Sequence, residues 1–81
     1  MGSEFYEKLT ALTSKELAEI RKTADADRAG AMVENIARIL GFTVAVLTKG
    51  DAEGIDRMIA GAEAYAMEEA VEKSKFARVM G

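Results

Sequence analysis

The 81-residue chain has no cysteine, no histidine, no proline and no tryptophan. Without cysteine it has neither disulfides nor a thiolate metal site, and without histidine it lacks the commonest zinc and copper ligands. A chain this short buries only about 60% of its unfolded surface, so its own core is marginal. We therefore expect it to be stabilised by regular helix packing or by a partner chain.

Catalytic and metal-binding groups are equally scarce. Without histidine, nucleophilic catalysis would need a lysine or a carboxylate as base, and no glycine-rich phosphate loop is present. Asp25, Asp27 and Gly30 match three positions of a calcium loop, but Ala29 and Ile36 stand where that loop requires oxygen ligands. We predict no catalytic residues, no metal and no cofactor, and that the chain is not an enzyme.

The formal net charge of −3 is unevenly distributed. Between Asp51 and Glu72 stand seven acids and a single base, Arg57. Nucleic-acid binding needs clustered Lys and Arg, so this pattern argues against it. The lack of cysteine fits a reducing cytosol, and the N-terminal residues show no secretory pattern, so we predict a cytoplasmic protein. We interpret residues 1–5 as a cloning-site scar or a flexible N-terminus, and 6–81 as a single helical domain.

The sequence predicts an all-α chain, because proline is absent and strong helix formers dominate. A capping box of Thr13 with Glu16 predicts that a short lead-in over residues 4–12 ends there. A first full helix would then run from Ser14 to about Ala24. Its buried residues would be Leu17, Ile20 and Ala24.

A long helical hairpin follows, over about 28–48 and 52–78. Asp25 and Asp27 suit the start of its first helix, and Gly50 with Asp51 suits the turn. The second helix carries a core stripe that includes Ile55, Ile59, Ala62, Tyr65 and Phe76. Glu69 and Lys73 lie within that stripe, either because the helix outruns the core or because they set the register across a subunit interface.

The nine residues from Ile39 to Leu47 contain no charge, although 31% of the chain is charged. A membrane span needs about 20 apolar residues, and Arg38 and Lys49 end this run, so we expect no membrane span. A strand that begins after Gly41 is an alternative, paired with the same strand of a second subunit. We favour a helix that is apolar all round, which needs cover on every side. Both interpretations predict a partner chain.

We therefore predict a homodimeric helical bundle. Its dimer or partner interface would consist of Ile39, Phe42, Val46, Ala60, Ala64, Met67 and Val71. An acidic face of Asp56, Glu63, Glu68 and Glu72 would bind a protein partner with a basic surface. The predicted function is protein–protein binding, as a regulator, adaptor or inhibitor of the phage- or plasmid-borne type. The alternatives are a dimeric nucleic-acid-binding regulator that uses Arg21, Lys22, Arg28 and Arg38, and a bundle that binds a small apolar ligand.

Overall fold

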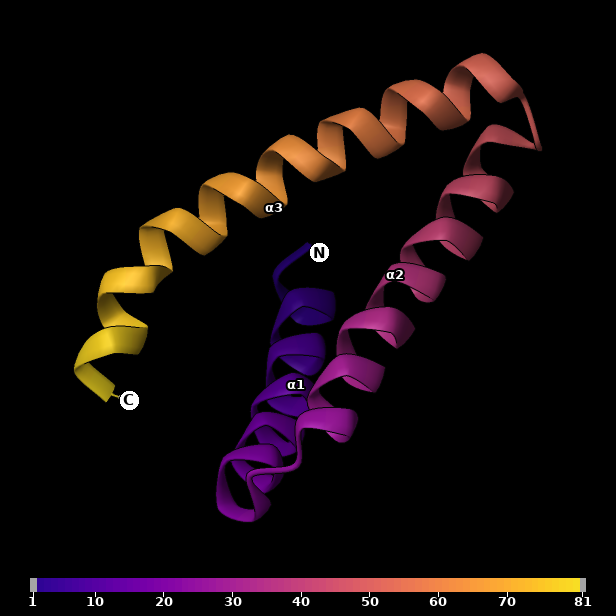
Figure 1. Cartoon of the computed structure of the whole chain (residues 1–81). Helices are drawn as coiled ribbons and strands as arrows, with labels where there is room; N and C mark the ends of the chain where they lie inside the picture. Colours follow the sequence, from indigo (N-terminus) through magenta and orange to yellow (C-terminus); the bar gives the residue numbers. More distant parts are fainter. Residues whose placement is uncertain (1, 81) are drawn as a thin grey trace. The chain divides into compact units, whose positions relative to one another are not determined.

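The computed structural model describes residues 2–80, and the side chains of residues 3–78. Three helices follow one another, α1 (Gly2–Thr23), α2 (Ala26–Thr48) and α3 (Ala52–Met80), and no strand occurs in 2–80 (Figure 1). The predicted all-α class is confirmed, and the predicted hairpin ends lie within two residues of the observed ones. The chain divides into two compact units, Met1–Ala37 and Arg38–Gly81, and α2 contributes to both.

The predicted break in the first helix is wrong, because α1 is a single helix of 22 residues that passes through Thr13. The Thr13 hydroxyl does not cap a helix start; it donates to the carbonyl of Leu9 at 3.0 Å. Thr10 likewise donates to the carbonyl of Tyr6 at 2.9 Å. Both hydroxyls are satisfied within the preceding helical turn, and no glycine or proline interrupts the stretch, so nothing ends the helix here.

The first turn lies where the sequence predicts it. The amide of Ala24 donates to the carbonyl of Ile20 at 2.7 Å, and Ala24 has a φ of 53°. This is a left-handed cap at the end of α1, held by alanine instead of the usual glycine. Asp25 then caps α2, since its Oδ1 accepts the amide of Arg28 at 3.0 Å.

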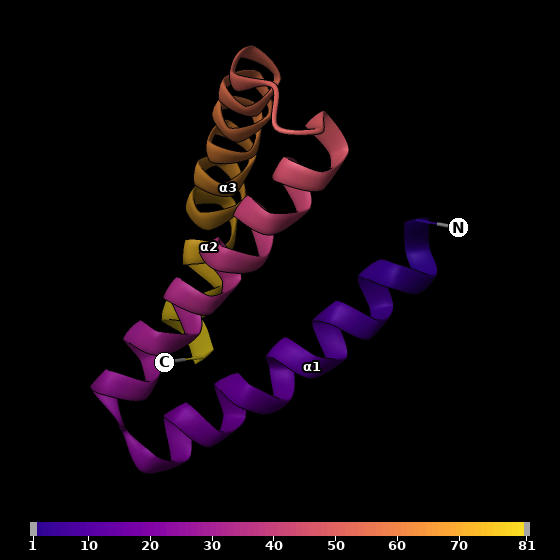
Figure 2. The same cartoon turned by 90° about the vertical axis from the view of Figure 1, so that its right-hand side faces the viewer.

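Residues 42–47 are helical, so the helical interpretation of the uncharged run is confirmed and the strand is wrong. Figure 2 shows α2 as one continuous helix between its connections to α1 and α3. Gly41 does not end the helix, and a side chain at this position would meet nothing within 4 Å. The helix ends further along the chain, at Thr48, where Lys49 adopts a left-handed backbone conformation.

The second turn is a Schellman motif. The amide of Gly50 donates to the carbonyl of Ala45 at 3.1 Å, and the amide of Lys49 donates to Val46 at 3.2 Å. Lys49 (φ 54°) and Gly50 (φ 79°) are both left-handed. Asp51 then caps α3 by accepting the amide of Gly54 at 2.8 Å. The turn thus satisfies the backbone at both helix ends.

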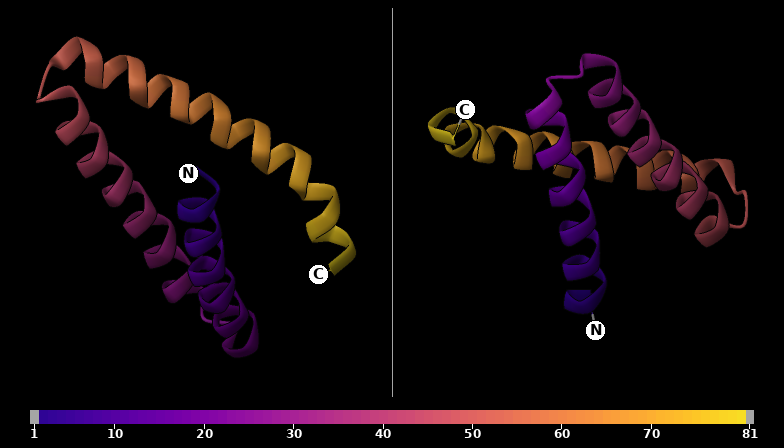
Figure 3. Two further views of the ribbon diagram at one scale, coloured as in Figure 1. Left: turned by 180° about the vertical axis from the view of Figure 1, so that it is seen from behind. Right: turned by 90° about the horizontal axis from the view of Figure 1, so that it is seen from below.

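Gly54 lets the end of α2 approach the first turn of α3. A Cβ on Gly54 would lie 3.2 Å from the Thr48 side chain and 3.2 Å from the Asp51 carboxylate, closer than ordinary van der Waals contact. From this point α3 runs for 29 residues without interruption, as Figure 3 shows from two further directions.

Burial is sparse in the part of the chain whose side chains the structure describes. Val44, at 4% exposure, is the one buried hydrophobic residue there. The predicted burial of Leu17 and Ala24 is wrong, because both are exposed and Leu17 is 50% accessible, whereas Ile20 is half-buried. Three helices with this little internal cover leave most of their apolar side chains in water.

Candidate interaction surface

Apolar cover within Arg38–Gly81 is concentrated near the second turn. Val44 lies four residues before the end of α2, and the half-buried apolar residues of α3 are Ile55, Ile59 and Ala62. All three belong to the predicted core stripe of this helix. The stripe is therefore confirmed as a core face over the first three turns of α3.

The side of α2 opposite Val44 carries the predicted interface residues. At 100° per residue, Ile39, Phe42 and Val46 all point roughly 140–160° away from Val44. Phe42 is 72% exposed, and Ile39 and Val46 are similarly accessible. The structure thus brings these three side chains together on one exposed face, which we call the Phe42 face.

On α3, the second predicted stripe also occupies one side of the helix. Ala60, Ala64, Met67 and Val71 recur at intervals of three and four residues, and all four are exposed. They point away from Ile55 and Ile59, so nothing within Arg38–Gly81 covers them in the described structure.

The core stripe of α3 loses its cover beyond Ala62. Tyr65 is 76% exposed and Phe76 is 66% exposed, although both continue the side that carries Ile55 and Ile59. Between these aromatic residues, the Lys73 ammonium lies 3.7 Å from the Glu69 carboxylate, one turn earlier. We call this exposed continuation, residues 65–76 on the side of Ile55, the distal stripe.

The four predicted acidic residues do not share one face. Asp56 and Glu63 lie on one flank of α3, and Glu68 and Glu72 lie on the opposite flank, because the helix turns by 100° at each residue. All four side chains are exposed. A single flat partner surface would contact one pair, so the acidic face is more accurately two acidic flanks.

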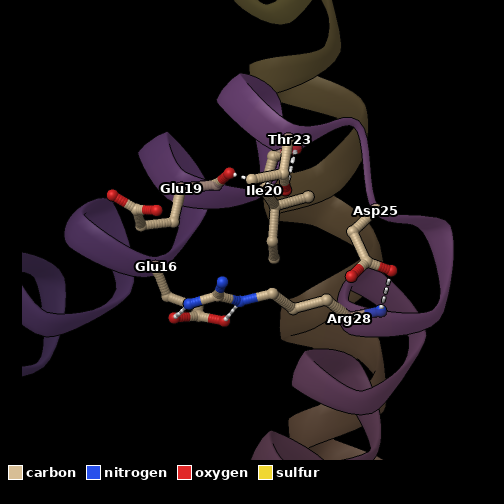
Figure 4. Close-up of polar contacts among 6 residues, drawn as sticks. All are labelled: Glu16, Glu19, Ile20, Thr23, Asp25 and Arg28. Atoms are coloured by element: carbon tan, nitrogen blue, oxygen red, sulfur yellow. Dashed lines mark hydrogen bonds and ion pairs between the residues drawn. The ribbon is translucent and has the colours of Figure 1, made fainter.

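Within Met1–Ala37, a polar contact joins α1 to α2. The Arg28 guanidinium donates to both oxygens of Glu16, at 2.6 Å and 2.9 Å (Figure 4). This bidentate bond lowers the pKa of Glu16 and raises that of Arg28. From the sequence alone, Glu16 was predicted to belong to a capping box and Arg28 was a candidate phosphate contact. No local pattern pairs the two residues, because they stand 12 positions apart on either side of the turn at Asp25.

The pair also weakens the nucleic-acid alternative. Arg28 is one of the four cations that this alternative needs, and its guanidinium is already occupied by a carboxylate that would compete with phosphate. Lys22 and Arg38 are exposed, but they come from different helices of the chain.

As a helix, α2 has the length and composition of a membrane-crossing segment. It contains 23 residues, and an 18-residue stretch of it has a mean hydropathy of 1.5 with 6% of its residues buried. The uncharged run from Ile39 to Leu47 is by itself too short to have this property, which belongs to the helix as a whole. The core helix of a soluble bundle has the same composition, so the property fits either environment.

Comparison of the chain with known protein families, curated proteins and solved structures found no match.

Proposed function

We propose that this chain works by protein–protein binding, as an obligate homodimeric helical bundle that acts as a regulator, adaptor or inhibitor. The observation that carries this proposal is the exposure of apolar side chains on several sides of the uncharged run from Ile39 to Leu47, with Val44 buried and Phe42 opposite it 72% exposed. A helix that is apolar all round is stable in water only when other protein covers it.

The faces left uncovered within the unit Arg38–Gly81, the Phe42 face and the stripe through Ala64, support the same proposal. A second copy brings an identical set of uncovered faces, so a symmetric dimer satisfies both chains at once.

A protein partner fits α2 better than a lipid bilayer. A span over Ala26–Thr48 would be centred near Ala37, which puts Arg38 at the bilayer midplane and Glu34 one turn away. A charged residue at that depth costs about 2.5–3.5 kcal/mol on insertion scales. In a bundle, the same two residues are free to face water.

The dimer would then present the two acidic flanks to a further partner. Asp56 and Glu63 on one side, and Glu68 and Glu72 on the other, would attract a protein with a basic surface, chiefly by steering its approach. Their exposure leaves them accessible without any rearrangement of α3.

The test is the mass of the purified chain in solution without detergent, with Phe42→Glu as the disrupting variant and Phe5→Glu as its control. Both phenylalanines are about 70% exposed, but Phe5 lies outside the predicted interface. We expect a dimer that Phe42→Glu dissociates and Phe5→Glu leaves intact. A compact monomer, or a chain that is soluble only with lipid vesicles or detergent, would contradict the proposal.

A further inference from the structure

We propose that the distal stripe of α3 pairs with the same stripe of a second copy, in antiparallel orientation, with Glu69 of each chain facing Lys73 of the other. This inference rests on the proposed dimer and adds to it a second contact, on α3, besides the one predicted at the Phe42 face. It starts from a pattern in which the positions on one side of α3 alternate three and four residues apart, as in a coiled-coil seam. These positions are 55, 59, 62, 66, 69, 73 and 76.

The unit Arg38–Gly81 by itself covers only the first part of this seam. Ile55, Ile59 and Ala62 are half-buried, whereas from Ala66 to Phe76 the positions are exposed. Phe76, at 66% exposure, ends the seam with a large apolar side chain that has no cover in the described structure. The uncovered part is short, about three turns, and it is interrupted by two charges.

These charges determine the orientation. In a parallel pair in register, Glu69 would face Glu69 and Lys73 would face Lys73, which places like charges together at the contact. In an antiparallel pair centred near residue 71, each Glu69 meets the Lys73 of the other chain, which gives two reciprocal ion pairs. The ammonium and carboxylate already lie 3.7 Å apart within one helix, so both side chains are extended along this side.

Side-chain size agrees with the same register. When Glu69 faces Lys73, Ala66 faces Phe76, so each aromatic ring packs over a small residue. A shift of one heptad in either direction would place the charges opposite apolar residues and remove both ion pairs between the chains, which costs free energy at the contact. Charge and size therefore select one register, with Ala70 of each chain beside the two-fold axis.

Single cysteines introduced into this cysteine-free chain test the geometry. We choose Ala70→Cys and Ala66→Cys, two equal substitutions one helical turn apart. In the antiparallel pair, the two residues at position 70 are offset by about 3 Å along the axis and the two at position 66 by about 15 Å. We expect Ala70→Cys to form a disulfide-linked dimer at least about tenfold faster than Ala66→Cys under mild oxidation, because a disulfide requires Cα atoms within about 7 Å.

Faster crosslinking at position 66 would indicate a parallel pair and overturn the inference, as would equally slow crosslinking at both positions in a chain that sediments as a dimer. A monomeric wild-type chain would instead contradict the proposed function itself. The charges provide an independent check: Lys73→Glu should weaken dimerisation about tenfold through like charges at two sites, and adding Glu69→Lys should restore it. Failure of the exchange to restore the dimer would overturn the proposed ion pairs.

Discussion

The two halves of the α3 stripe have the same apolar character and opposite environments. Ile55 and Ile59, beside the turn, are half-buried by their own unit, whereas Tyr65 and Phe76, further along the same side, are 76% and 66% exposed. The turn explains the covered half, because the Schellman motif and Gly54 hold the end of α2 close to the start of α3. The distal half needs cover from elsewhere, and this need is the reason for proposing a second copy.

The largest expected effect is at the covered half. Val44→Asp places a carboxylate at the one buried position of the described side chains, and an unpaired buried charge costs several kcal/mol, a large share of the 5–15 kcal/mol that stabilises a typical domain. We expect loss of cooperative urea unfolding monitored by circular dichroism. Thr43→Asp is the control. Thr43 stands next to Val44 in the sequence but its side chain is exposed, so this change should cost less than about 1 kcal/mol.

Substitutions in the distal half should change the affinity of the dimer. Phe76→Glu removes an aromatic anchor from the proposed contact, and we expect dimerisation to weaken at least about 30-fold, as interface aromatics commonly do. The neighbouring exposed Lys75→Glu points away from the stripe and should change affinity less than about threefold. Sedimentation equilibrium measures both, and equal effects of the two variants would remove Phe76 from the interface.

The unit Met1–Ala37 offers a smaller, pH-dependent comparison, because the Glu16–Arg28 ion pair joins α1 to α2 there. Arg28 holds the pKa of Glu16 below its usual 4.5, so this carboxylate stabilises the fold above the unfolded pKa and loses that contribution as the pH falls through the folded pKa. We expect Glu16→Gln to lower the thermal midpoint at pH 6 but to have little effect near pH 3. Glu19→Gln is the control, and a pH-independent difference for Glu16→Gln would contradict the assignment.

The smallest expected effect concerns the turn between α2 and α3. Lys49 adopts a φ of 54°, which glycine tolerates better than lysine. Lys49→Gly should therefore stabilise the fold by about 0.5–1 kcal/mol, measured by urea unfolding at fixed protein concentration. Ala45→Gly, in the last turns of α2, should have the opposite sign because it weakens a helix interior. Destabilisation by Lys49→Gly would argue against the left-handed cap.

The sequence predicted the helices and turns well where local chemistry decides them. Asp25 and Asp51 cap helices as their positions suggested, and the uncharged run is helical. The break at Thr13 was wrong, because the same hydroxyl can also donate back into a continuous helix and only tertiary context separates the two outcomes. Local signals also missed the Glu16–Arg28 pair, since it forms across a turn.

The sequence was less informative about burial and about surfaces. Periodicity identified the apolar side of α3 but not the residue at which its burial ends. Burial depends on which other helix packs against the stripe, and the residues of the stripe do not encode this. The four acids were grouped by their proximity in the sequence, whereas the uninterrupted helix separates them into two flanks. The Phe42 face and the stripe through Ala64 lie on single sides as predicted, and their role as interfaces stays a prediction.

The central claim is that a second copy is required to maintain the fold. Helicity and mass measured together over a thousandfold dilution, by circular dichroism and sedimentation velocity, test it most directly. The account predicts a dimer at micromolar concentration whose helicity is lost as it dissociates, because Val44 is the one buried hydrophobic residue among the described side chains. A compact monomer that keeps its full helicity throughout the dilution would contradict it.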